Sequence, residues 1–314
     1  MTDAHETFEA YFAREIAPAL ADLEAERRKA VTRHNIAVGV GAALGLVAFV
    51  WIASRGGPSP PAFIVAGIIV VLGVGVGQAM LALTARTVKD ALVPRVAAFA
   101  GVTFSRKVSD PSAIHTFRKH GLVPSYDRSS FEDFFSGTRA DCPFELFEAH
   151  LKQRHRDSKG RTHYTTCFRG QVLRVLVPVN FLGVTVVLRD AGIFNRLIKP
   201  ERALERVRLV DPKFEKTFEV FSNDQVEARY LLSPDFMERL LALETMLKGK
   251  KARAAFADGE LMIAIEGGNL FEAGSMFTPL ADPARARKVW GEIESVHGVI
   301  DALLAARRQG AANG

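Results

Sequence analysis

Two long runs of apolar residues dominate the pattern of the chain. The first extends from Ile36 to Ser54 and the second from Ala62 to Ala85, and neither contains a charged side chain. A helix needs about 20 apolar residues to cross the ~30 Å hydrocarbon layer of a bilayer. Buried core helices are the alternative, but such helices rarely stay uncharged over this length. The pattern therefore predicts two membrane-spanning helices.

The segment between the two runs predicts a turn. Residues 55–61 read Arg-Gly-Gly-Pro-Ser-Pro-Pro, a composition typical of turns, so the helices should form an antiparallel hairpin. Lysine and arginine in the flanking segments decide the orientation of such a hairpin. The loop contains one of them, Arg55, whereas the outer flanks contain Arg27, Arg28, Lys29, Arg33, Arg86, Lys89 and Arg95. We therefore expect both termini on the cytoplasmic side of an inner membrane.

Glycines recur at four-residue spacing in both runs, as Gly41 with Gly45 and as Gly73 with Gly77. Glycines one turn apart let helix backbones approach closely in lipid. The pairs are consistent with packing inside the hairpin or with contacts in a homo-oligomer. Neither run contains an ionisable residue, which ion and proton pathways usually require, so the pattern argues against a pump or a channel.

The remaining chain divides around this hairpin, which occupies residues 35–85. Residues 1–34 carry an amphipathic stripe, predict a cytoplasmic helix and should be kinked or divided at Pro18. Residues 86–120 are interpreted as a basic, helical juxtamembrane connector. Residues 121–306 are expected to form a cytoplasmic domain, and residues 307–314 a disordered tail.

Short β-branched and aromatic runs in residues 121–306 predict strands. Residues 144–151 fit a strand or a short helix, and the other expected strands cover residues 164–168, 172–177, 184–188, 207–210, 218–221, 254–257 and 261–265. Gly170 is expected in a hairpin turn between the second and third of these segments. Asp258-Gly259 is a strong hairpin signal between the last two.

Helices are expected after most of the strands. Ser222 with Gln225 predicts a capping box, and Ser233-Pro234 predicts a second helix start. A final helix after Asp282-Pro283 carries apolar residues at heptad spacing over residues 289–303, which should pack on the sheet or form a dimer contact. Strands with segregated helices predict an α+β fold of mainly antiparallel strands.

The net charge of +6 is unevenly distributed. Residues 86–174 contain 16 basic and 9 acidic side chains, whereas residues 175–314 contain 19 of each. Anionic headgroups attract juxtamembrane cations, so this basic half is expected to contact the inner leaflet. The candidate lipid contacts are Arg86, Lys89, Arg95, Arg106 and Lys107. The basic residues form no nucleic-acid recognition pattern, so nucleic acid is not expected as a partner.

Sequence signatures of catalysis and cofactor binding are absent. The chain lacks a phosphate-binding GxxxxGK[ST], an HExxH and a G-x-S-x-G elbow. Cys142, Cys167, His150 and His155 could be combined into a metal site, but solvated histidines and a core cysteine are the favoured interpretation. We therefore predict no catalytic residue, no cofactor and no metal, and we favour a non-enzymatic protein.

Several motifs in order resemble the DUF3137 family. They are Phe-Glu-Asp-Phe-Phe-Ser-Gly at 131–137, Phe-Arg-Gly at 168–170, FLGVTVVLRD at 181–190, residues 204–232 followed by Ser-Pro-Asp-Phe-Met-Glu-Arg-Leu-Leu, and residues 259–279. The resemblance implies a membrane-anchored bacterial protein. It also implies a LemA-type membrane protein as a partner, because genes of the two families are often neighbours. It supplies no catalytic residues.

Two functions are consistent with these observations. The first is a membrane-tethered binding or scaffolding module, with a candidate partner surface at Asp224, Glu227 and Arg229. The second is an enzyme or regulator at the inner leaflet, which a polar cleft with converging carboxylates or histidines would favour. Asp224 could instead favour the dipole of a helix start, and the other two side chains could simply be solvated.

Overall fold

The computed structural model describes residues 7–108, 111, 113–178, 180–189, 204–247, 249–268 and 270–312, with side chains as far as Ala306. These residues form two compact units. One unit contains Met1–Val96 and Glu272–Lys288, and the other contains Ala97–Phe271 and Val289–Gly314. The chain therefore passes between the units three times.

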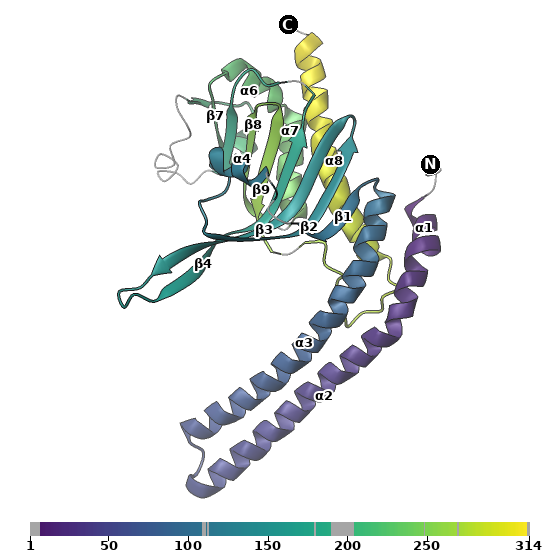
Figure 1. Ribbon diagram of the computed structural model, residues 1–314, viewed down its shortest axis with the longest axis vertical. Coiled ribbons are helices and arrows are strands. Elements are labelled where there is room, and N and C mark those ends of the chain that lie inside the picture. The colour runs from purple at the N-terminus through teal and green to yellow at the C-terminus, as the bar shows by residue number, and fades with distance from the viewer. Residues whose placement is uncertain are drawn as a thin grey trace. The chain divides into compact units, whose positions relative to one another are not determined.

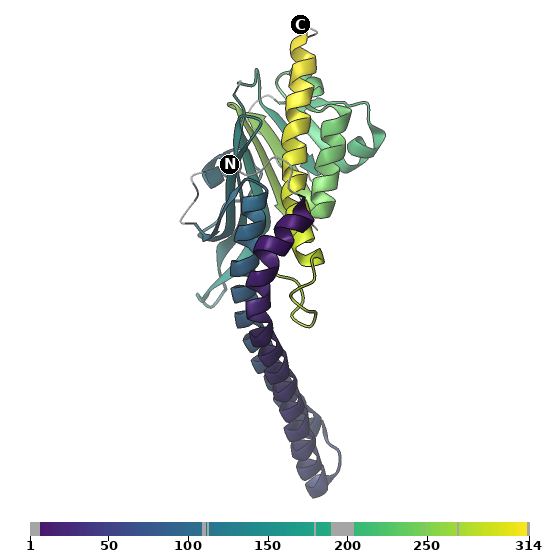
Figure 2. The same cartoon turned by 90° about the vertical axis from the view of Figure 1, so that its right-hand side faces the viewer.

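The first unit is built on a helical hairpin. Its helices are α1 (Phe8–Tyr11), the π-helical turn η1 (Phe12–Ile16), α2 (Ala17–Gly56) and α3 (Pro60–Phe99), whose last residues belong to the other unit. α2 and α3 run side by side in opposite directions (Figures 1 and 2). The predicted break at Pro18 takes the form of η1, after which Pro18 occupies the first turn of α2, where its missing N–H is not needed.

The apolar runs of this hairpin are exposed. Helices Phe8–Gly56 and Pro60–Phe99 are long and apolar enough to cross a membrane. Leu46, Val47 and Val71 are 64%, 65% and 69% exposed. A core helix of a soluble protein would bury such side chains. Length and exposure together indicate that the hairpin associates with a membrane.

The second unit is built on a single antiparallel sheet with strand order β1-β2-β3-β4-β9-β8-β5-β7-β6. Its strands are β1 (Thr103–Lys107), β2 (Arg128–Arg139), β3 (Cys142–Arg156), β4 (Thr162–Leu176), β5 (Thr185–Arg189), β6 (Glu205–Val207), β7 (Phe218–Ser222), β8 (Lys250–Ala257) and β9 (Glu260–Glu266). Helices accompany the strands, so the α+β prediction is confirmed.

Helices cover both faces of this sheet. They are α4 (Ala113–Lys119), α5 (Pro212–Thr217), α6 (Gln225–Leu231), α7 (Pro234–Met246) and α8 (Ala284–Ala312). α4 buries Phe117 in a cluster with Val172 and Ala264 of the sheet. α7 and α8 lie on the opposite face (Figure 2), where Phe236 packs on Phe256 and His297 packs on Phe144.

The apolar residues of α8 at heptad spacing are buried inside the chain. Val289, Val296, Ile300 and Leu303 are fully buried, and Ile293 is 2% exposed. The helix continues to Ala312, so the predicted disordered tail is helical over its described residues. Alanine and arginine, which favour helices, dominate this end of the chain.

Two local predictions are wrong and one is confirmed. Gly170 is not in a turn, because β4 passes through it without a break. A Cβ atom at Gly170 would lie 1.9 Å from the carbonyl oxygen of Ile265, so glycine is needed here for the close approach of β9. The cap of α6 is Asp224 rather than Ser222. Asp258 and Gly259 both have positive φ and form the predicted turn between β8 and β9.

Candidate functional site

Residues 272–288, here called the strap, belong to the same compact unit as the helical hairpin. The strap follows the last strand of the sheet in sequence and ends in the first turn of α8. Its first residue, Glu272, forms an ion pair with Lys89 of α3 at 3.5 Å. Near its other end, Arg287 pairs with Glu9 of α1 at 3.2 Å. Both ends of the strap are thus tied to the helices.

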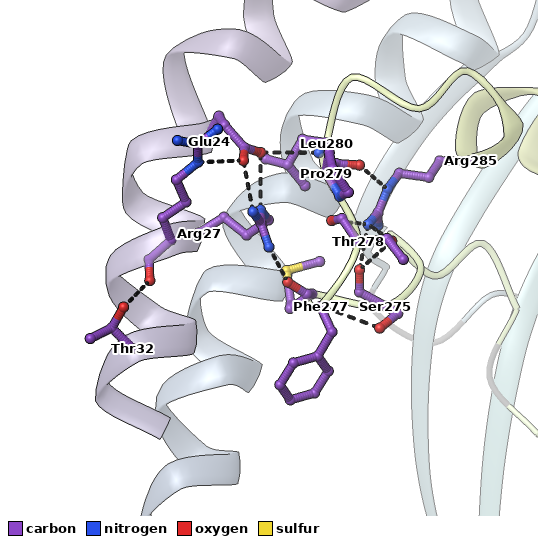
Figure 3. Close-up of polar contacts among 11 residues, drawn as sticks. Glu24, Arg27, Thr32, Ser275, Phe277, Thr278, Pro279, Leu280 and Arg285 are labelled. Carbon is purple, nitrogen blue, oxygen red and sulfur yellow. Dashed lines mark hydrogen bonds and ion pairs between the residues drawn. The ribbon is translucent and has the colours of Figure 1, made fainter. Parts of the chain in front are cut away.

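A buried arginine organises the middle of the strap. Arg285 is only 7% exposed, and its guanidinium points into the loop that precedes it (Figure 3). It donates hydrogen bonds to the hydroxyl of Thr278 and to the carbonyl oxygens of Ala273, Ser275, Thr278 and Pro279. A buried charge requires this degree of hydrogen bonding to offset its desolvation. One side chain therefore fixes the path of the strap backbone.

Glu24 and Arg27 of α2 bind the outside of the same loop. They form an ion pair at 2.7 Å along one face of the helix. Arg27 also donates to the carbonyl oxygen of Met276 at 2.7 Å, and Glu24 accepts from the backbone N–H of Leu280 at 3.0 Å (Figure 3). We call Glu24, Arg27 and Arg285 the clamp. All three side chains bind strap backbone, and two of them belong to α2.

The electrostatics of the clamp favour the charged form of the Glu24–Arg27 pair, whereas burial lowers the pKa of Arg285. The hydrogen bond from Arg27 lowers the pKa of Glu24 from 4.5 to about 2, helped by the Leu280 N–H and by Arg28, while burial opposes the shift. The same bond raises the pKa of Arg27 above its usual value.

A pH dependence of strap docking follows from this shift. Because the pKa of Glu24 is depressed in the folded state, its contribution is complete above pH 4.5 and is lost as the pH falls toward about 2. We expect the amide of Leu280 to exchange slowly and uniformly between pH 7 and 5, after correction for intrinsic exchange, and to lose protection below pH 4.5. Glu24→Gln should remove this dependence. An unchanged profile in that variant would contradict the assignment.

The tip of the strap reaches the start of the first apolar run. Phe277 packs edge-on against His34 of α2, with ring centroids 5.5 Å apart. His34 is buried, and a Cβ atom at Gly77 would lie 2.6 Å from its Nδ1. Phe277 is nevertheless 55% exposed. The strap thus places the exposed aromatic side chain of Phe277 against His34, which lies two residues before the apolar run that begins at Ile36.

The four glycines predicted for helix packing lie where α2 meets α3. A Cβ atom at Gly73 would lie 2.8 Å from the carbonyl oxygen of Ala37 and 2.9 Å from Cα of Gly41. A Cβ atom at Gly45 would lie 3.0 Å from the carbonyl oxygen of Ala66. Together with the contact between Gly77 and His34, these distances mean that a Cβ atom at any of the four positions would meet the facing helix closely.

The second unit contains a groove lined by residues of β1, β2, β3 and β4. Its volume is about 370 Å³, and its lining includes Thr103, Ser136, Thr138, Phe144, Glu145 and Arg174. Arg174 donates to both carboxylate oxygens of Glu260 and lies 3.8 Å from Glu145. The ion pair with Glu260 raises the pKa of Arg174. The groove therefore holds one cation that already has an internal partner.

Comparison with known proteins finds a family model that resembles the C-terminal part of the chain. Residues 166–304 match the family model described as protein of unknown function, DUF3137. The resemblance to DUF3137 is confirmed. No curated protein matches the chain. The crystal structure of the mycobacterial trehalose monomycolate transport factor A, TtfA, aligns with 69% of this chain and 96% of that one, at 11% identity and a TM-score of 0.36.

The DUF3137 match covers only one of the three clamp residues. The match includes the strap and Arg285, whereas Glu24, Arg27 and the whole hairpin precede it. Residues of the DUF3137 part therefore bind helices that the family model does not include. The same match contains Arg174 and Glu260 of the groove but not Thr103 or Glu145.

The predicted lipid contacts lie in different surroundings. Lys89 is paired with Glu272 and its side chain is only 12% exposed. Arg95 donates to the carbonyl oxygen of Ala91 at 2.6 Å. Arg86, Arg106 and Lys107 are exposed. The structure thus commits Lys89 to the strap, leaves Arg95 half-buried and places Arg86, Arg106 and Lys107 at the surface.

The predicted partner surface lies on α6, within the DUF3137 part. Asp224 caps the helix by accepting from the N–H groups of Val226 and Glu227. Glu227 accepts from the N–H groups of Leu182 and Gly183 at 2.8 and 2.9 Å. Arg229 donates to the carbonyl oxygen and side chain of Gln225. Each side chain has a role inside the unit, which sequence reasoning offered for Asp224 alone.

Sequence reasoning missed the clamp. Glu24, Arg27 and Arg28 stand at the three- and four-residue spacings of helical ion pairs, which was a usable signal. Arg285 gave no such sequence signal, because an arginine in the first turn of a helix is usually solvated. Its burial depends on a loop that folds back around it.

Proposed function

We propose that this chain is a membrane-tethered scaffolding protein of the bacterial inner membrane. Its hairpin anchors it with both termini in the cytoplasm, and the DUF3137 part binds a partner there. The observation that carries this proposal is the clamp. Arg285, Arg27 and Glu24 form charged hydrogen bonds with the strap backbone, and two of these side chains belong to α2. The strap is continuous with the sheet through β9 and with α8. A tether that only needed to hold a domain near a membrane would not require this second attachment.

The orientation has a direct test. The flanks of the hairpin carry seven lysine and arginine residues against one in the loop, so both ends should remain cytoplasmic. A reporter that is active only in the periplasm, fused to the C-terminus, should be inactive. A cytoplasm-active reporter at the same position should be active. Periplasmic activity would overturn the orientation and the proposed scaffold with it.

The partner we propose is another membrane protein, of the LemA type. The motivation is the neighbourhood of genes implied by the family resemblance, with homo-oligomers as the other assembly to be tested. Crosslinking in native membranes should capture the LemA-type protein with the wild-type chain. Capture should fall with Arg285→Gln, which frees the strap, and persist with Arg287→Gln. Capture of neither a LemA-type protein nor a second copy would contradict the scaffold.

A second candidate function is a regulator or enzyme that binds a ligand in the groove. The observation that favours it is that Glu145 and Arg174 both line a groove of about 370 Å³, with Glu260 paired to Arg174. Arg174→Gln would leave Glu260 without its cation. A small-molecule screen by thermal shift that finds ligands for the wild-type chain but not for this variant would favour this function over the scaffold.

A further inference from the structure

The outer ends of β3 and β4 form an isolated two-stranded ribbon, here called the arm and defined as residues 152–166. β2 pairs with β3 only as far as Lys152, and β9 pairs with β4 only from Gly170. Beyond these points the two strands form ladder pairs only with each other, apart from hydrogen bonds that join Asp127 to Lys152 and Arg154 at the base of the arm. Figure 1 shows the two strands running past the rest of the sheet. Both faces of the arm are therefore accessible.

The arm concentrates the positive charge of the chain. It contains five lysine or arginine residues and one carboxylate: Lys152, Arg154, Arg156, Lys159, Arg161 and Asp157. Asp157 is used within the turn, where it accepts from the N–H groups of Lys159 and Arg161 and pairs with the Arg161 side chain. In the part of the chain that the structure describes, no carboxylate forms an ion pair with Lys152, Arg154 or Arg156.

Strand alternation places the cations on one face. Lys152, Arg154 and Arg156 alternate along β3, so their side chains share a face with that of Tyr164, which is paired with Arg154 in the register. Arg128 of β2 joins them, with its guanidinium 3.8 Å from the centre of the Tyr164 ring. Four cations and one aromatic ring thus share this face, on which Arg128, Arg154 and Arg156 are exposed and Lys152 and Tyr164 are half-buried. The opposite face carries the stacked rings of His155 and His163 instead.

A shift in pairing next to the arm strengthens this interpretation. The register shifts between Leu151 and Lys152, where Leu151 is opposite Phe168 but Lys152 is opposite Thr166. Such a bulge adds a residue to one strand and increases the local twist. It separates a buried sheet region, which ends at Leu151 and Phe168, from the exposed basic arm. The arm is therefore a distinct element rather than a frayed end of the core.

We propose that this basic face of the arm binds the anionic headgroups of the membrane in which the hairpin is anchored, an inference that rests on the proposed membrane anchoring. Anionic lipid attracts basic segments near its surface, and tethering by the hairpin raises the local concentration of headgroups around the arm. Arginines that alternate on an open strand can each reach a separate phosphate. Tyr164 adds the kind of side chain that is enriched at the membrane–water interface.

The test uses the full chain in lipid nanodiscs. Cys142 and Cys167 are replaced by alanine, and a donor dye is attached through Ser158→Cys in the turn of the arm. Trace acceptor dye marks the lipid headgroups. Energy transfer should rise when phosphatidylglycerol replaces part of the phosphatidylcholine, and it should fall again in 1 M salt, where the screening length is only ~3 Å.

Matched variants assign the effect to the arm. Replacing Lys152, Arg154 and Arg156 by glutamine should lower the ratio of docked to undocked arm about 100-fold, at about five-fold per charge removed. The sequence predicted Arg106 and Lys107 as candidate lipid contacts. The double variant Arg106→Gln with Lys107→Gln should change the ratio of docked to undocked arm by only a few fold. Transfer in neutral discs should be the same for all variants, which checks that the arm is folded.

Other results would overturn the inference. Equal transfer in neutral and anionic discs would show that the arm does not bind headgroups. Loss of transfer in the Arg106 and Lys107 variant but not in the arm variant would assign binding elsewhere. Tight binding of a labelled oligonucleotide in neutral discs, lost in the arm variant, would assign the arm to nucleic acid. Failure of the chain to insert into any nanodisc would instead contradict the proposed membrane anchoring.

Discussion

Arg285→Gln is expected to release the strap from the helical hairpin. The substitution removes the guanidinium that donates to Ala273, Ser275, Thr278 and Pro279, and glutamine can replace only part of this set. Breaking a buried charged network costs about 3–5 kcal/mol. The amide of Leu280, which donates to Glu24, should then exchange at least about 100-fold faster, since each 1.4 kcal/mol is a factor of ten.

The matched control for this experiment is Arg287→Gln. Arg287 lies on the same helix turn and pairs with Glu9, but both side chains are more than half exposed. An exposed ion pair contributes about 0–1 kcal/mol, so exchange at Leu280 should change by only a few fold. If the two variants exchanged alike, Arg285 would not organise the strap.

Gly73→Ala is expected to weaken the contact between α2 and α3. The new Cβ atom would lie 2.8 Å from the carbonyl oxygen of Ala37 and 2.9 Å from Cα of Gly41, and backbone atoms cannot rotate away. The helices must therefore separate, at a cost of about 1–3 kcal/mol for overpacking. Thermal unfolding of the full chain in detergent or nanodiscs should show a lower midpoint for this variant.

Gly75→Ala is the control, because it adds the same methyl group to the same helix. A Cβ atom at Gly75 has no heavy atom within 4 Å. Since alanine favours helix over glycine, this variant should be neutral or slightly more stable. Equal losses in the two variants would mean that the glycines do not pack the hairpin. A change of oligomeric state with Gly75→Ala would favour the alternative contact between copies.

Sequence patterns predicted elements whose information is local. The apolar runs, Ser233-Pro234 and Asp258-Gly259 each carry their signal within a few residues, and the structure forms the helices and the turn at those positions. The segment around Gly170 was misread because glycine also permits close approach of a neighbouring strand, and that strand, β9, lies far away in sequence. The edge strand β1 was missed because it is short and mostly exposed.

The clamp could not be predicted for the same reason. Met276 and Leu280 are separated from their partners on α2 by about 250 residues, and no local pattern links them. The sequence predicted the arm only in part. The count of basic residues over 86–174 included those of the arm but did not separate them from the others. Only the register of β3 and β4 gathers Lys152, Arg154 and Arg156 on one face.

Crosslinking between the strap and α2 in native membranes tests the central claim most directly. His34→Cys with Phe277→Cys, in a chain whose own cysteines are replaced by alanine, joins positions whose rings are 5.5 Å apart. A short bifunctional crosslinker should link them within one chain. Ser54→Cys with Phe277→Cys is the control, because Ser54 lies about 30 Å further along the helix at 1.5 Å per residue. The account predicts efficient crosslinking of the first pair and none of the second, whereas failure of the first pair in an inserted, folded chain would contradict it.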